Sequence, residues 1–189
     1  MTRNIQFKAS SAIVVSALVI MATISAYANT TPKDAVPHPQ VAAELTEFKQ
    51  TVFEMRGEAD ALHSFTRNRQ MHWQSHTNRL DALKQHVNKL GKHLASLESL
   101  KASASESQQM AIEQARPHLV AVAQNLTEAI EMVNVSRRSV YDADYTEAVL
   151  SIQVHADSLH QKLSAILDHE KAKIRLDKLG MSPASTEGS

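Results

Sequence analysis

Histidine is the residue of this sequence with the greatest capacity for chemistry, since ten of the 189 residues are histidine and none is cysteine. Histidine is the commonest metal ligand, and its charge changes near neutral pH. His72 and His76 are four residues apart, so on one helix they share a face and could chelate a single ion. His76 also falls on an apolar stripe beside Trp73, whereas His72, His86 and His93 share a flanking stripe. The sequence therefore predicts that His76 is buried, and it makes His72 and His76 candidate ligands of an unspecified metal.

Two segments place an aspartate and a histidine three residues apart, namely Asp60 with His63 and Asp157 with His160. This spacing is similar to that of the Glu-x-x-His pairs of di-iron bundles. In each segment a leucine takes the core position, so the aspartate and the histidine are turned to the sides of the helix. We expect these pairs to be solvated, because a metal site needs all of its ligands to converge.

Haem is a second chemistry that histidine can support, since a histidine and a methionine hold it in some cytochromes. No spacing pairs His76 with one particular methionine, and methionines at helical spacing more often fill a core. The sequence therefore predicts no cofactor, and a metal- or haem-binding bundle that uses His76 and neighbouring histidines and methionines is the alternative function. The available methionines are Met55, Met71, Met110 and Met132.

The sequence carries no motif for nucleophilic catalysis. It contains no glycine-framed serine, no cysteine and no glycine-rich phosphate loop. Short basic clusters at Arg67 with Arg69 and at Arg137 with Arg138 adjoin expected helix ends, where they can complement terminal carbonyl groups. An anion or lipid-headgroup site is the alternative for these arginines. We therefore expect a protein that is not an enzyme.

The first 28 residues have the order of a secretory signal peptide. Arg3 and Lys8 precede an apolar run over residues 12–24, and Ala26-Tyr27-Ala28 supplies a small-x-small cleavage site. The run is shorter than the roughly 20 residues that span a bilayer, so cleavage is favoured over a retained anchor. Cleavage removes two of the 20 basic residues and none of the 20 acidic ones, which leaves a formal charge of about −2. We expect a periplasmic or secreted protein with no membrane span after cleavage and no nucleic-acid partner.

The elements that must position these side chains are helices, since four glycines in the whole chain leave little turn chemistry for a β-protein. Apolar residues recur in steps of three and four over residues 40–66, 73–100, about 105–133 and 144–179. The first stripe continues through Trp73 and His76, so a single helix over residues 40–100 is the alternative to a break at the polar run Arg67–Gln70. Short connections between them predict an all-α, antiparallel up-down-up-down four-helix bundle over residues 40–179, with heptads like those of a coiled coil. A proline-rich spacer over 29–39 and a tail over 180–189 are expected to be disordered.

Local signals refine these helices. Capping boxes are predicted at Ser103–Glu106 and Asp144–Glu147. Pro117 predicts a kink near residues 113–117, because proline removes a helical hydrogen bond. Gly91 is either tolerated or faces a close helix crossing. The inward stripes are Val41, Leu45, Phe48, Val52, Met55, Ala59 and Leu62; Trp73, Leu80, Leu83, Val87, Leu90, Leu94 and Leu97; Ile112, Ala115, Leu119, Val122, Leu126, Ile130 and Val133; and Val149, Ile152, Ala156, Leu159, Leu163 and Ile166.

Several short runs between residues 60 and 176 are not required by plain heptads or form a distinctive combination. They are Trp73–His76, Val87-Asn88 ahead of Gly91, Gln108-Gln109 with Ala111-Ile112, Arg116-Pro117 with Leu119, and Asn125 with Thr127, Ala129 and Ile130. These runs resemble a family of uncharacterised exported helical proteins associated with acidobacteria. The pattern departs at Val135–Arg138, where the family has an asparagine-rich turn. The resemblance implies a secreted four-helix fold and supplies no activity, but it draws attention to Trp73–His76 and to Arg116-Pro117.

These observations favour a non-enzymatic periplasmic bundle that binds another protein or a component of the cell envelope. The candidate ligand or interaction site comprises Trp73, His76, His72 and Arg116, at one end of the bundle. The oligomeric state is open, because Leu150 and Val154 widen the apolar face of the last helix.

Overall fold

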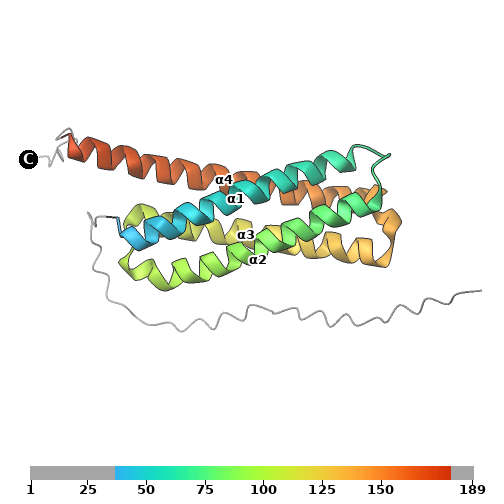
Figure 1. Cartoon of the computed structure of the whole chain (residues 1–189), viewed down its shortest axis with the longest axis horizontal. Coiled ribbons are helices and arrows are strands. Elements are labelled where there is room, and N and C mark those ends of the chain that lie inside the picture. The colour runs from blue at the N-terminus through green and yellow to red at the C-terminus, as the bar shows by residue number, and fades with distance from the viewer. Residues whose placement is uncertain (1–36, 180–189) are drawn as a thin grey trace, which may run out of the picture. The chain divides into compact units, whose positions relative to one another are not determined.

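The computed structural model describes residues 37–179, and no strand occurs among them (Figure 1). The predicted signal peptide, most of the predicted spacer and the predicted tail lie outside these residues. The all-α prediction is confirmed for the described part of the chain, which contains four α-helices. The helices are α1 (Pro39–Thr66), α2 (Trp73–Leu100), α3 (Glu106–Val135) and α4 (Ala143–Lys178), with short 3-10 helices η1 (Lys101–Ser103) and η2 (Arg137–Tyr141) before α3 and α4.

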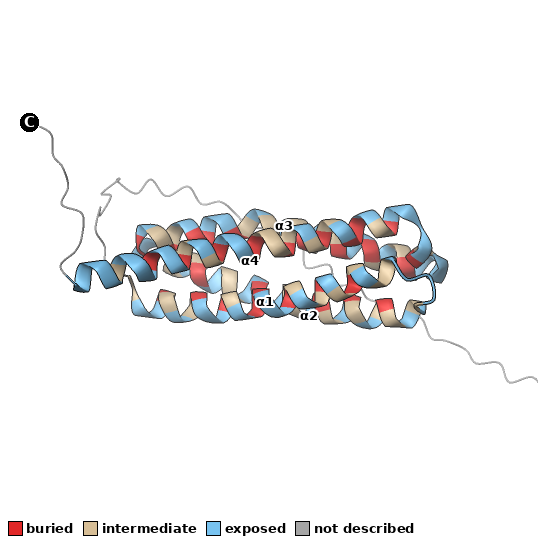
Figure 2. Ribbon diagram, turned by 90° about the horizontal axis from the view of Figure 1, so that it is seen from above, coloured by how far each residue is buried: buried red, intermediate tan, exposed pale blue. Residues whose placement is uncertain are grey.

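Burial follows the predicted stripes closely, and Figure 2 shows the buried residues along the faces that the helices turn toward one another. All seven predicted residues of α1 are buried, at 1% exposure or less. Each large aliphatic or aromatic side chain removed from water contributes about 1.5–3 kcal/mol, so these stripes explain why amphipathic segments become packed helices. Five stripe residues are only partly buried against the core, namely Trp73, Val87, Leu94, Ile130 and Ile166.

Helix α1 lies between α2 and α4, and polar pairs line both of its edges. On the side of α2, Glu58 accepts a hydrogen bond from Arg79 at 2.6 Å. On the side of α4, Arg56 pairs with Asp157, and Lys49 lies 3.9 Å from Asp168. In these three pairs α1 supplies the carboxylate toward α2 and the basic group toward α4, while acidic Asp60 also lies on the side of α4.

The caps differ from the prediction. The capping box before α3 is formed by Ser105 and Gln108, so the prediction at Ser103 was wrong by two residues. Ser103 instead ends η1, and this extra turn places the extended cap conformation at Ser105. Asp142 is the N-cap of α4 and makes no side-chain cap hydrogen bond, so the second predicted box is also wrong. Tyr145, inside that box, is fully buried in the core.

Two residues that disfavour helices are accommodated at the surface. Gly91 is exposed, and a Cβ atom added there would meet nothing within 4 Å, so no helix crosses closely at this point. Pro117 is exposed inside α3, which continues on both sides of it. The carbonyl group that loses its helical partner belongs to exposed Glu113, where water can bind it. Within residues 37–179, no helix combines the length and apolar character needed to cross a membrane.

Candidate functional site

His76 is the buried histidine among the described residues, as the sequence predicts. Its ring is 1% exposed and lies 5.7 Å from the ring of Phe65 and 5.5 Å from that of Tyr145, centroid to centroid. His76 Nδ1 and the hydroxyl of Tyr145 form a hydrogen bond of 3.1 Å, while Nε2 is buried without a hydrogen-bond partner. Burial lowers the pKa of His76 and raises the pKa of Tyr145, so both groups are neutral at neutral pH.

His72 has different surroundings from His76. It is exposed at the N-cap of α2, and its ring lies 5.8 Å from that of Trp73. Trp73 is in turn covered by the guanidinium group of Arg137, which stands 4.3 Å from its ring centroid in a cation–π contact. The first turn of α2 is thus held by aromatic and cationic packing. These contacts favour a structural role for Trp73 over a metal site shared by the two histidines.

Arg116 does not belong to this end of the fold. Its guanidinium group pairs with Glu98 at 2.8 Å. At 1.5 Å per residue, Glu98 lies about 33 Å from His76 along α2. The expectation that Arg116 shares a site with Trp73, His72 and His76 was therefore wrong, because the residues that surround Pro117 pack near the opposite end of α2.

The Asp-x-x-His segments lie on helix flanks, as expected, but only Asp60 is exposed, whereas His63, Asp157 and His160 are half-buried. Asp60 accepts a hydrogen bond from Gln153, and Asp157 pairs with Arg56. The ring of His160 lies 5.7 Å from that of Phe53. Burial lowers the pKa of His160, with smaller contributions from Arg56 and Lys49 that outweigh the opposing effect of Asp157.

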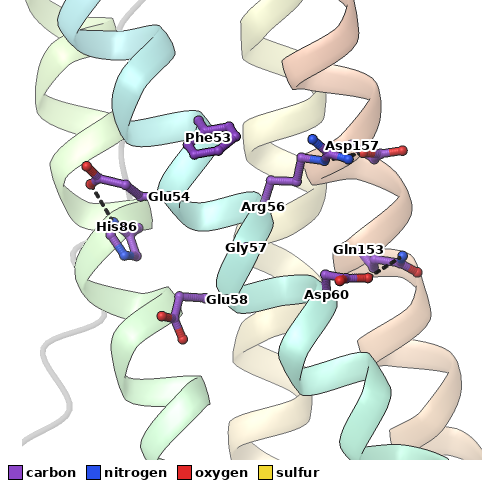
Figure 3. Close-up of a pocket in the computed structure, with 9 residues that line it drawn as sticks. All are labelled: Phe53, Glu54, Arg56, Gly57, Glu58, Asp60, His86, Gln153 and Asp157. Atoms are coloured by element: carbon purple, nitrogen blue, oxygen red, sulfur yellow. Dashed lines mark hydrogen bonds and ion pairs between the residues drawn. The ribbon is translucent and has the colours of Figure 1, made fainter.

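A shallow hollow of about 570 Å³ runs over the outer face of α1. Figure 3 shows that its polar side chains turn toward partners on either side: Glu54 toward His86 of α2, and Arg56 and Asp60 toward α4. Gly57 contributes no side chain at the centre. The charged groups are therefore directed away from a common point, and the hollow does not bring together a nucleophile and a base.

A buried polar network that the sequence analysis missed joins α3, α4 and the residue before α1. The hydroxyl of Ser105 donates to Glu170 at 2.7 Å and accepts from the backbone of Gln108 at 3.2 Å. The side chain of Gln108 makes two hydrogen bonds with the backbone of His38, at 3.2 and 3.3 Å. The sequence did contain an indication that Glu170 is buried, since Glu170 lies one heptad after Leu163 on the inward stripe. The network therefore links the N-terminal end of α1 to the start of α3 and to α4.

A second missed cluster lies between α1 and α2. The carboxylates of Glu44 and Glu47 and the imidazole of His93 place their donor atoms within 4.8 Å of one another. Glu44 Oε1 is 2.7 Å from His93 Nδ1. The sequence signal was the flanking stripe of His93, but its acidic partners could be identified only once α1 was placed beside α2.

The fold and these clusters define a class: a cysteine-free chain whose described residues, 37–179, form four α-helices with several polar pairs between neighbouring helices. Comparison with protein-family models, with curated proteins and with solved structures finds no match to this chain. The resemblance to the acidobacterial family therefore stays a prediction.

Proposed function

We propose that this chain is an exported, non-enzymatic helical bundle that binds the anionic surface of the cell envelope through the C-terminal end of α4. The proposal includes a signal peptide cleaved after Ala28 and an antiparallel up-down-up-down arrangement of the helices. The arrangement is supported by the pairs between α1 and α2, because the partner of Glu44 is His93 and that of the later residue Glu58 is Arg79.

The observation that carries the proposal is the basic end of α4. Figure 1 shows this helix continuing past its neighbours. After Glu170 none of the described residues of α4 is buried. Within residues 37–179, no ion pair within 4 Å involves the basic residues of this end, while Asp177 is its single acidic residue. These basic residues are Lys171, Lys173, Arg175 and Lys178.

The spacing of these residues supports a lipid surface over a soluble anion. Lys171, Arg175 and Lys178 are separated by four and three residues and therefore share one face of the helix. Leu176 and Leu179 are 43% and 70% exposed on the same short segment. Basic residues can remain among anionic headgroups while neighbouring leucines enter the acyl boundary, as in interfacial amphipathic helices.

Vesicle binding tests the proposal. The chain should partition onto phosphatidylglycerol vesicles and much less onto phosphatidylcholine vesicles, and salt should weaken the binding. Each basic residue near an anionic surface contributes about 1 kcal/mol, so replacing three of them should weaken the partitioning about 100-fold. The test variant combines Lys171→Gln, Arg175→Gln and Lys178→Gln.

The matched control makes the same change of charge on exposed lysines of α2 and combines Lys84→Gln, Lys89→Gln and Lys92→Gln. It should bind anionic vesicles nearly as well as the unchanged chain. Equal losses in the two triple variants would show that net charge, rather than the end of α4, controls binding. Equal binding to neutral and anionic vesicles would also refute the proposal.

A further inference from the structure

We propose that Glu44, Glu47 and His93 form a binding site for one divalent transition-metal ion of the zinc type. The site is separate from the His72 and His76 pair and uses no residue of the basic end of α4. One imidazole nitrogen and two carboxylate groups from two adjacent helices supply its ligands. Three protein ligands leave one position of a tetrahedral ion for water or another small ligand.

The distances fit an ion after small side-chain movements. Zinc binds histidine nitrogen and carboxylate oxygen at about 2.0–2.2 Å, so two ligands of a tetrahedral ion are roughly 3.4 Å apart. Glu44 Oε1 and His93 Nδ1 are 2.7 Å apart, and no donor pair of the cluster exceeds 4.8 Å. The first pair must therefore open by less than 1 Å and the others must close by about 1.5 Å or less. Rotation about the glutamate side-chain bonds can supply such movements without a shift of either helix.

Packing between α1 and α2 already holds two of the three ligands. The side chain of His93 is 14% exposed and that of Glu44 is 24% exposed. Glu47 lies three residues after Glu44, on the same side of α1, and is exposed. Glu47 can therefore turn toward the ion while the other two ligands stay nearly in place, which lowers the entropy lost on binding.

The charge of the cluster also favours a divalent cation. Among the described residues, no lysine or arginine lies within 4 Å of the carboxylate oxygens of Glu44 or Glu47, whereas Glu58 in the same groove pairs with Arg79. Bound to an ion, Glu44 and Glu47 would each contribute one negative charge and His93 a neutral nitrogen donor. A divalent ion would balance these two charges, and its bond to His93 Nδ1 would take the place of the hydrogen bond between Glu44 and His93.

The donor set identifies the class of metal. Imidazole with carboxylate suits zinc and other late divalent ions, whereas calcium prefers six to eight oxygen ligands and copper(I) prefers sulfur.

The place where His118 and His155 meet is less suited to a metal ion. The Nδ1 atoms of these two histidines are 3.3 Å apart. The positive charge of Lys162 lies close enough to contribute to lowering the pKa of His118, and such a charge opposes a cation there.

Calorimetric titration of the full chain with zinc chloride at pH 7.5 tests the site, with protein purified without a histidine tag and freed of metal by a chelator. The expected result is one zinc ion per chain. Glu47→Gln should weaken binding at least about 10-fold, since loss of a residue that only hydrogen-bonds to a metal ligand already weakens metal binding by about that much. Because Glu47 is exposed, this variant should fold normally, which circular dichroism can verify. Cobalt(II) should give a visible absorption typical of tetrahedral coordination, and Glu47→Gln should reduce it.

The same groove offers a matched control. His86 and Glu54 form a looser pair, 3.9 Å apart, that belongs to no cluster of three ligands among the described residues. Glu54→Gln should leave zinc binding unchanged. The inference is wrong if Glu54→Gln weakens binding as much as Glu47→Gln, or if Glu47→Gln has no effect. It is equally wrong if the chain binds no zinc, or if His155→Asn alone abolishes binding.

Discussion

Removing the hydroxyl group of Tyr145 tests the buried hydrogen bond that organises the end of the fold where α2 begins. In Tyr145→Phe, His76 loses the one hydrogen bond that its ring makes, and Nε2 is already without a partner. Both nitrogens would then be buried and unsatisfied, because the ring is 1% exposed. The ring cannot escape the cost by gaining a proton, since burial already lowers the pKa of His76.

The expected loss follows from the cost of an unsatisfied buried polar group, which is about 1–3 kcal/mol. His76→Leu should also be destabilising, because it leaves the Tyr145 hydroxyl unpaired and puts a branched side chain into the space of a planar ring. The double variant His76→Leu with Tyr145→Phe buries no unpaired polar group at this position. Its loss should therefore be smaller than the sum of the two single losses by about 1–2 kcal/mol.

Urea unfolding followed by circular dichroism at pH 7.5 measures these differences. Tyr141→Phe is the control, because the hydroxyl of Tyr141 also donates a hydrogen bond, to the carbonyl of Met71, but at an exposed position where water can replace it. The control should lose less than about 0.5 kcal/mol. The reasoning is refuted if Tyr145→Phe is as stable as the unchanged chain. Strict additivity of the two single variants would refute it as well.

Three further predictions concern stability and can be measured by urea or thermal unfolding. Leu83→Ala should lose about 2–5 kcal/mol, because Leu83 is fully buried and its neighbours only partly fill the cavity. Ser105→Ala should lose about 1–2 kcal/mol, since it removes the α3 cap, and Ser105→Thr should recover part of that loss. Acid should destabilise the fold, because some histidines have a lower pKa in the folded chain than the value of about 6.5 that they have in the unfolded chain. Such a histidine contributes its full stabilisation above a pH of about 6.5, and this contribution is lost as the pH falls toward the pKa of the folded chain. Unfolding that is equally easy at pH 7.5 and pH 5 would contradict this prediction, which rests on His76, His118 and His160.

Most of the helical structure could be predicted because one physical rule governs it. Apolar residues in steps of three and four must face a common core, and this rule located all four helices and the burial of His76. The caps were harder to predict, because Ser103 and Ser105 are chemically alike. Only the turn formed by η1 determines which of them reaches the first amides of α3.

The clusters required information that a linear sequence does not contain. Glu44 and His93 are far apart in the chain, and their meeting depends on the register between α1 and α2. Glu170 could be assigned to a stripe, but not matched to Ser105. Arg116 was misplaced for the same reason, since periodicity describes the faces of a helix and says little about which residue of a neighbouring helix stands opposite.

The charged pairs on the two edges of α1 also affect which helix packs on which side of α1 while the chain folds. If α2 and α4 exchanged places beside α1, Glu58 would face the aspartates of α4, and Arg56 would face Arg79 of α2. Each exposed pair contributes less than about 1 kcal/mol, but the attractions that Arg56 and Glu58 make would both become repulsions. The chain therefore carries, on its first helix, an electrostatic preference for one handedness of assembly over its mirror arrangement.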